Sequence, residues 1–200
     1  IHLARYHRAA RAAQLLGGRV WPLAAVFGRL RVPIMSLSPP PATFSSHAFR
    51  QALGMFATGV TVVTARQDDG AWVGLTVSSF NSLSLTPPLV LWSLGLQSSR
   101  LQALRDCSHY AVNVLSAQQV DLARHFATRG PDWSAVAHQP GPNGAPLLDG
   151  CLAHFECRNA RHFTEGDHDI FVGEVLHCAR HPGRVPLLYH AGQFYTEVPL

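Results

Sequence analysis

The segment from residue 58 to residue 88 constrains the fold most, because it has the pattern of a β-hairpin that ends in hydroxyl residues. It reads TGVTVVTARQDDGAWVGLTVSSFNSLSLTPP. β-Branched residues around Thr61 to Val63 predict a first strand, Asp69-Gly70 favours a tight turn, and Trp72 to Ser78 predicts the returning strand.

The two faces of the returning strand differ, because side chains alternate along a strand. The apolar face holds Val73, Leu75 and Val77, and the small, hydroxylated face holds Gly74, Thr76 and Ser78. Thr76-Val77-Ser78-Ser79 places three hydroxyls beside main-chain N–H groups, a combination that suits a phosphate and the close approach of a flat ligand. A sheet edge with Ser and Thr facing water explains the same residues, so both interpretations are open.

The remaining elements indicate a mainly β fold with peripheral helices, without regular βαβ alternation. Apolar spacing predicts a helix from about Ser45 or Ser46 through Phe56, Ser98 is expected to cap a short helix, and a capping box at Ser116 predicts a helix to about Ala127. The predicted strands are Leu89–Leu94, Tyr110–Val114, Cys151–Arg161, Asp169–Cys178 and a pair near Leu188 and Phe194, with a loop over Gly130–Gly150. Because neither GxGxxG nor GxxxxGK[ST] occurs, a closed or nearly closed antiparallel barrel is favoured over a Rossmann or P-loop fold.

Composition indicates one folded domain and no nucleic-acid or membrane partner. The 200 residues are 47% hydrophobic and 14% charged, and the apolar runs are too short to cross a bilayer. The net charge of +4 arises mainly from six arginines before Pro33, and from Met35 onward ten arginines face twelve acidic residues. A surface that follows phosphates is therefore not expected.

Residues 1–34 are rich in arginine and contain no acidic residue. We expect an N-terminal extension over 1–45 that the fold does not need, with Met35 as a natural translation start, followed by a domain over 46–200. A targeting or lipid-surface helix is the alternative. The four cysteines have no CxxC spacing and the histidines are scattered, which favours a reduced, cytoplasmic protein without a metal site.

Eight ordered blocks between about Phe49 and Tyr195 resemble the short-chain flavin reductases, the reductase components of two-component flavin-dependent monooxygenases. The blocks are TGVTVVT, GLTVSSFNSLSLTPPLVLWSL, SSR, YAVNVL, ARHFA, GAPLLDGCLAHFEC, EGDHDIFVGEV and PLLYHAGQFY. This resemblance implies an FMN-binding split barrel, usually homodimeric. It also implies hydride transfer from NAD(P)H to free FMN or FAD, with reduced flavin supplied to a partner monooxygenase of the aromatic hydroxylation type.

The resemblance also implies a set of site residues. His168, in the Gly166-Asp167-His168 turn, is expected to orient the nicotinamide or polarise the flavin, and Ser98-Ser99-Arg100 suits a phosphate because Arg is a permanent forked cation. The predicted cofactor-binding residues are Thr61, Thr76, Val77, Ser78, Ser79, Ser82, Ser98, Ser99 and Arg100. Tyr189 and Tyr195 are weaker candidates for stacking on a ring, with core packing as the alternative.

The sequence does not decide between FMN and FAD. NADH is favoured over NADPH, because no arginine-rich pocket for a 2′-phosphate can be identified from spacing. Two other functions fit the same fold: an oxidoreductase whose bound flavin acts directly on an organic substrate, and a flavin- or haem-binding module without activity.

Overall fold

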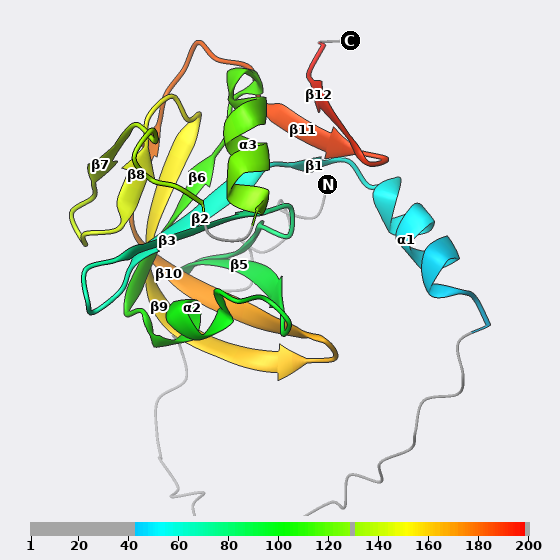
Figure 1. Ribbon diagram of the computed structural model, residues 1–200, viewed down its shortest axis with the longest axis horizontal. Coiled ribbons are helices and arrows are strands. Elements are labelled where there is room, and N and C mark those ends of the chain that lie inside the picture. The colour runs from blue at the N-terminus through cyan, green and yellow to red at the C-terminus, as the bar shows by residue number, and fades with distance from the viewer. Residues whose placement is uncertain (1–42, 129–130, 199–200) are drawn as a thin grey trace, which may run out of the picture. The chain divides into compact units, whose positions relative to one another are not determined.

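The computed structural model describes residues 43–128 and 131–198, and Figure 1 shows a mainly β architecture with helices at its periphery. The helices are α1 (Ser46–Gly54), α2 (Leu101–Asp106) and α3 (Val120–Ala127), with a 3₁₀ turn at Ala117–Gln119 before α3. Among these described helices, none is long and apolar enough to cross a membrane. The strands are β1 (Thr58–Gly59), β2 (Thr61–Arg66), β3 (Trp72–Val77), β4 (Asn81–Leu85), β5 (Pro88–Gly95), β6 (His109–Val114), β7 (His138–Pro140), β8 (Pro146–Leu148), β9 (Ala153–Glu165), β10 (His168–Arg180), β11 (Leu187–His190) and β12 (Gln193–Thr196).

Seven strands form one antiparallel sheet in the order β3-β2-β6-β9-β10-β5-β4. Its two edge strands, β3 and β4, are consecutive in the chain and are joined only by residues 78–80. This confirms the predicted mainly β split barrel with peripheral helices. Smaller sheets, β1-β11-β12 and β7-β8, accompany it.

The predicted hairpin is confirmed as β2 and β3, which pair from Thr61↔Val77 to Arg66↔Trp72. Gly70 has a φ of +87° in the turn, a conformation that glycine adopts without steric cost. The apolar face of β3 packs into the core, as predicted. Its small face is covered by α3, because a Cβ on Gly74 would lie 2.5 Å from Cε1 of Phe126. Only the end of this face, near Ser78, is open.

Successive residues of β2 are buried on both faces of the strand, because an apolar cluster packs against each face. Val63 and Ala65 belong to the first cluster, which is centred on Trp92 and Phe171 and includes residues of α2. Val62 belongs to the second cluster, which includes Phe126 of α3. α2 and α3 therefore cover different apolar clusters of the sheet (Figure 1).

The helix predictions are confirmed in part. Ser45 is the N-cap of α1, and the capping box of Ser116 and Gln119 is present before α3. The Ser98 prediction is wrong: α2 has Arg100 at its N-cap, and the Ser98 hydroxyl accepts a hydrogen bond from the Arg100 N–H at 3.3 Å in the preceding turn. The local turn of Ser98 thus ends before the helix begins.

Other differences concern the boundaries and exposure of elements. The loop over 130–150 contains the short strands β7 and β8, and β4 was not predicted as a separate strand. α1 ends at Gly54, and the apolar side chains of Phe49, Leu53 and Phe56 are 50%, 57% and 76% exposed. An apolar helical face was predicted correctly, but it does not pack on the described core.

Candidate functional site

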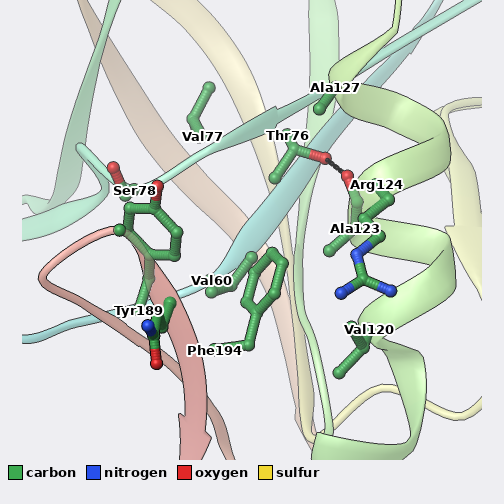
Figure 2. A pocket seen from close by; sticks show the side chains of 12 residues that line it. Val60, Thr76, Val77, Ser78, Val120, Ala123, Arg124, Ala127, Tyr189 and Phe194 are labelled. Carbon is green, nitrogen blue, oxygen red and sulfur yellow. Dashed lines mark hydrogen bonds between the residues drawn. The ribbon is translucent and has the colours of Figure 1, made fainter.

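A large cavity of about 820 Å³ opens beside the end of β3. Its walls come from β3, α3 and the β11–β12 hairpin (Figure 2). Ser78 lies on one side, Tyr189 and Phe194 project from the hairpin, and Arg124 reaches in from α3. The cavity therefore combines aromatic surface, a hydroxyl and one cation.

A smaller cavity of about 280 Å³ lies next to the first and shares Thr76, Val77 and Ser78 with it. Its other lining residues include Ser79, the end of β5 at residues 93–95, and His168. The structure thus brings together two of the predicted pieces, the hydroxyl strand end and the His168 turn. They lie about ninety positions apart in the sequence.

Ser79 connects the strand end to β5. Its hydroxyl donates to the Ser93 carbonyl and accepts from the Ser93 N–H, both at 2.9 Å. Ser93 lies two residues beyond the last β4–β5 pair, Asn81↔Leu91, so the Ser79 side chain continues the ladder where β4 has not yet begun. Both functions of this hydroxyl are used within the protein.

Thr61 and Thr76 also have intramolecular partners. The Thr76 hydroxyl donates to the Ala123 carbonyl of α3 at 2.7 Å (Figure 2), and the buried Thr61 hydroxyl donates to the Val77 carbonyl at 3.1 Å. The Val77 side chain lies in the first core cluster. By contrast, the exposed Ser78 hydroxyl has no hydrogen-bond partner among the described residues. Ser78 is therefore the residue of this group with a free hydroxyl to offer a ligand.

Ser98, Ser99 and Arg100 are not part of the walls of the two cavities. They lie just after the wall of the smaller cavity in the chain. Gly95 lines that cavity, and its carbonyl accepts a hydrogen bond from the Ser98 N–H at 3.0 Å. The Arg100 guanidinium donates to the Thr128 carbonyl at the C-terminal end of α3. Ser82 lies exposed on the edge strand β4, also outside both walls.

His168 is the first residue of β10 and pairs with Gly95 of β5. Its side chain is 49% exposed, and its Nδ1 lies 2.7 Å from Oδ1 of Asp167. This contact with His168 lowers the pKa of the Asp167 carboxyl. Gly166 has a φ of +61° in the turn, which positions the imidazole at the mouth of the smaller cavity.

Arg124 was not identified from the sequence. Val120, Arg124 and Ala127 follow the i, i+4, i+7 spacing of one helix face and all line the large cavity. The guanidinium lies 5.8 Å from the centre of the Phe194 ring, and it also contacts Asp121 at 3.3 Å near the surface. A cation on an otherwise apolar helix face is the signal that could have revealed it.

The donor set of the two cavities fits a flavin nucleotide. Val60, Val120 and Phe194 supply apolar wall, Ser78 supplies a hydroxyl, and Arg124 supplies a fork of N–H donors for a phosphate. A volume of about 820 Å³ lies within the usual range of about 300–1,000 Å³ for small-molecule sites.

Comparisons with known proteins agree with this chemistry. Residues 53–197 match the flavin reductase like domain, and the chain belongs to this family. It is 46% identical over 154 residues to an FMN reductase (NADH) of Agrobacterium fabrum, covering 77% of this chain and 87% of that protein. It is 39% identical over 151 residues to the reductase component of a 4-nitrophenol 4-monooxygenase/4-nitrocatechol 2-monooxygenase of Rhodococcus opacus, covering 76% and 80%. A solved structure of a Streptomyces globisporus NADH:FAD oxidoreductase, in complex with NAD and FAD fragments, superposes with a TM-score of 0.72 at 41% identity, covering 76% of this chain and 92% of that one.

Proposed function

We propose that the protein is an NADH-dependent flavin reductase that reduces free FMN or FAD and supplies the reduced flavin to a partner monooxygenase. The carrying observation is the pair of adjoining cavities that share the end of β3, one with Arg124 and the other with His168. The similar proteins support this proposal, because they include an NADH-dependent FMN reductase and a monooxygenase reductase component. NADPH is the less favoured reductant.

Each cavity has a distinct task in this proposal. The flavin supplies the redox chemistry, accepting a hydride from the nicotinamide. Ser78 and the main chain at the end of β3 bind the polar side chain of the flavin, and Arg124 binds its phosphate. His168 contacts the nicotinamide from the smaller cavity. The protein thus acts by binding and orienting its ligands, which requires no nucleophile or acid–base pair.

Four of the other predicted residues support the site through hydrogen bonds within the protein. Thr61 and Thr76 hold β3 against β2 and α3, Ser79 holds the segment after β3 against β5, and Arg100 connects the turn after β5 to α3. These bonds fix the strand end to which Ser78 belongs. Their partners are main-chain carbonyl or N–H groups, so they shape the cavities without changing their charge.

Steady-state NADH oxidation, followed at the nicotinamide absorbance with FMN or FAD added separately, tests the proposal. We expect turnover that depends on added free flavin. Turnover with only tightly bound flavin would favour an oxidoreductase that acts directly on an organic substrate, and no NADH oxidation would favour a binding module. His168→Ala should slow reduction by NADH while the flavin dissociation constant changes little, because the phosphate contacts lie elsewhere.

We further propose a homodimer in which α1 contributes to the interface. Its apolar side chains, Phe49, Leu53 and Phe56, are at least half exposed in the single chain. Completing the burial of such partly exposed side chains stabilises an association by about 1–2 kcal/mol each. Analytical ultracentrifugation should show a dimer, and Leu53→Glu should shift it toward monomer without a change of fold by circular dichroism.

We also propose that residues 46–200 form the reductase domain and that it works in a reducing, cytoplasmic setting. A compact unit begins at Thr43, close to the predicted boundary. Cys107, Cys151, Cys157 and Cys178 are free thiols, and burial raises the pKa of the first three to about 12. Buried thiols of this kind are inert core residues.

A further inference from the structure

A buried ion pair lies directly behind the His168 turn. Asp169 is completely buried, and Arg105 of α2 contacts both of its carboxylate oxygens, with Nε 2.6 Å from Oδ2 and Nη2 2.9 Å from Oδ1. The Thr164 hydroxyl donates to Oδ1 at 2.7 Å, and Nδ1 of His162 lies 3.8 Å from Oδ2. A forked Arg–carboxylate pair fixes orientation as well as distance.

This ion pair connects α2 to the paired strands β9 and β10 near their hairpin tip. Arg105 comes from α2, Thr164 from β9 and Asp169 from β10. α2 is itself attached to the sheet, because the Asn159 amide donates to the carbonyls of Leu104 and Cys107, each at 3.0 Å. The tip of the β9–β10 hairpin is therefore tied to a helix that has a fixed position.

His168 and Asp169 are adjacent on β10, so their side chains point to opposite faces of the strand. The Asp169 side faces α2, and the His168 side faces the smaller cavity. Holding the carboxylate on one face holds the backbone that orients the imidazole on the other. The turn is also tied to β5 by a bond from the Leu96 N–H to the Asp167 carbonyl at 2.9 Å.

We propose that Arg105 and Asp169 are positioning residues for His168, and that their ion pair keeps the imidazole oriented for the nicotinamide. This inference rests on the proposed flavin reductase function. The ion pair touches neither cavity, so it acts on the reaction only through the His168 turn.

Arg105→Lys is the main test variant, because it keeps the positive charge and removes the fork. Arg158→Lys is the matched control: Arg158 pairs with Glu174 across the same two strands, but away from the turn. Thr164→Val is a milder second variant that removes only the hydroxyl donor to Asp169. Each is made also in a His168→Ala background.

Two measurements on these variants test the proposal, and thermal melting checks that each variant is folded. The first is the rate of flavin reduction, measured by stopped flow at saturating flavin and NADH. We expect Arg105→Lys to lower the maximal rate about 10- to 100-fold, the loss typical of a group displaced by about 1 Å. Thr164→Val should lower it less, and Arg158→Lys should leave it unchanged. In the His168→Ala background, Arg105→Lys should cause no further loss.

The second measurement is the NMR signal of the His168 ring in the flavin-free protein, assigned by its disappearance in His168→Ala. We expect it to shift or broaden in Arg105→Lys and Thr164→Val, and not in Arg158→Lys.

Three results would overturn the positioning role: a normal maximal rate in folded Arg105→Lys, an equal loss with and without His168, or an unchanged His168 signal. If Arg105→Lys does not fold, a normal rate and signal in Thr164→Val overturn it instead. Failure of the proposed function looks different, because the wild-type protein would then show no flavin-dependent NADH oxidation.

Discussion

Replacing Ser79 and Ser78 one at a time should separate stability from flavin binding. Ser79→Ala removes the hydroxyl that hydrogen-bonds both the N–H and the carbonyl of Ser93, at a point on β5 that β4 does not reach. Leaving such groups without partners costs about 1–3 kcal/mol, and access of water from the smaller cavity places this site toward the lower end. In a domain of this size each kcal/mol lowers Tm by about 2–4 °C, so we expect a decrease of about 2–8 °C.

Ser78→Ala should weaken flavin binding and leave stability unchanged. Its hydroxyl is exposed at both cavities and has no partner among the described residues, so Tm should not change. Loss of a hydrogen bond to the polar side chain of the flavin costs about 0.5–1.5 kcal/mol, which corresponds to about a 2- to 13-fold weaker flavin affinity.

Thermal melting and a fluorescence titration of flavin, performed on both variants, check these expectations. Ser82→Ala is the control, because Ser82 is exposed on β4 outside both cavities, and neither Tm nor affinity should change. An unchanged Tm in Ser79→Ala would refute the ladder role of its hydroxyl. An unchanged flavin dissociation constant in Ser78→Ala would remove that residue from the site.

Three further predictions concern the rest of the chain. Arg105 lowers the pKa of Asp169 to about 2, so the ionised carboxylate stabilises the fold above its unfolded pKa near 3.8. The stability advantage of wild type over Asp169→Asn should therefore fall by about 2 kcal/mol as pH decreases from about 4.5 to 2 in urea titrations. Gly74→Ala should destabilise by about 1–3 kcal/mol, because its Cβ would collide with Phe126, whereas Gly59→Ala, with nothing within 4 Å, should melt like wild type. A fragment that begins at Met35 should melt and reduce flavin like the full chain, and loss of either property would contradict the predicted boundary.

Local patterns predicted the elements whose partners are close in sequence. The β2–β3 hairpin depends on alternation and on a turn that contains Gly70, and the helix before Ala127 depends on the Ser116–Gln119 capping box. Ser98 shows the limit of this reasoning. A serine ahead of an apolar run favours a cap, but here its hydroxyl binds the N–H of Arg100 within a turn, and the helix starts later.

The site itself depends on contacts that no local pattern contains. Ser79 and Thr76 offered equivalent hydroxyls in the sequence, yet their partners, Ser93 and Ala123, lie 14 and 47 positions away. Whether a hydroxyl is free for a ligand is therefore decided by tertiary pairing. Arg124 was missed for the same reason. The side of α3 that carries it becomes the wall of a cavity because the β11–β12 hairpin lies opposite.

The placement of His168 follows from the register of β10 on β5. Asp169 and Phe171 share the opposite face, where Asp169 binds Arg105 and Phe171 stacks on Trp92 with ring centres 4.3 Å apart. A slip of one residue would turn every side chain of β10 to the other face. It would break the ion pair and the aromatic stack while moving the imidazole into the core. The buried face thus specifies the register, and with it the position of the exposed imidazole on the other face.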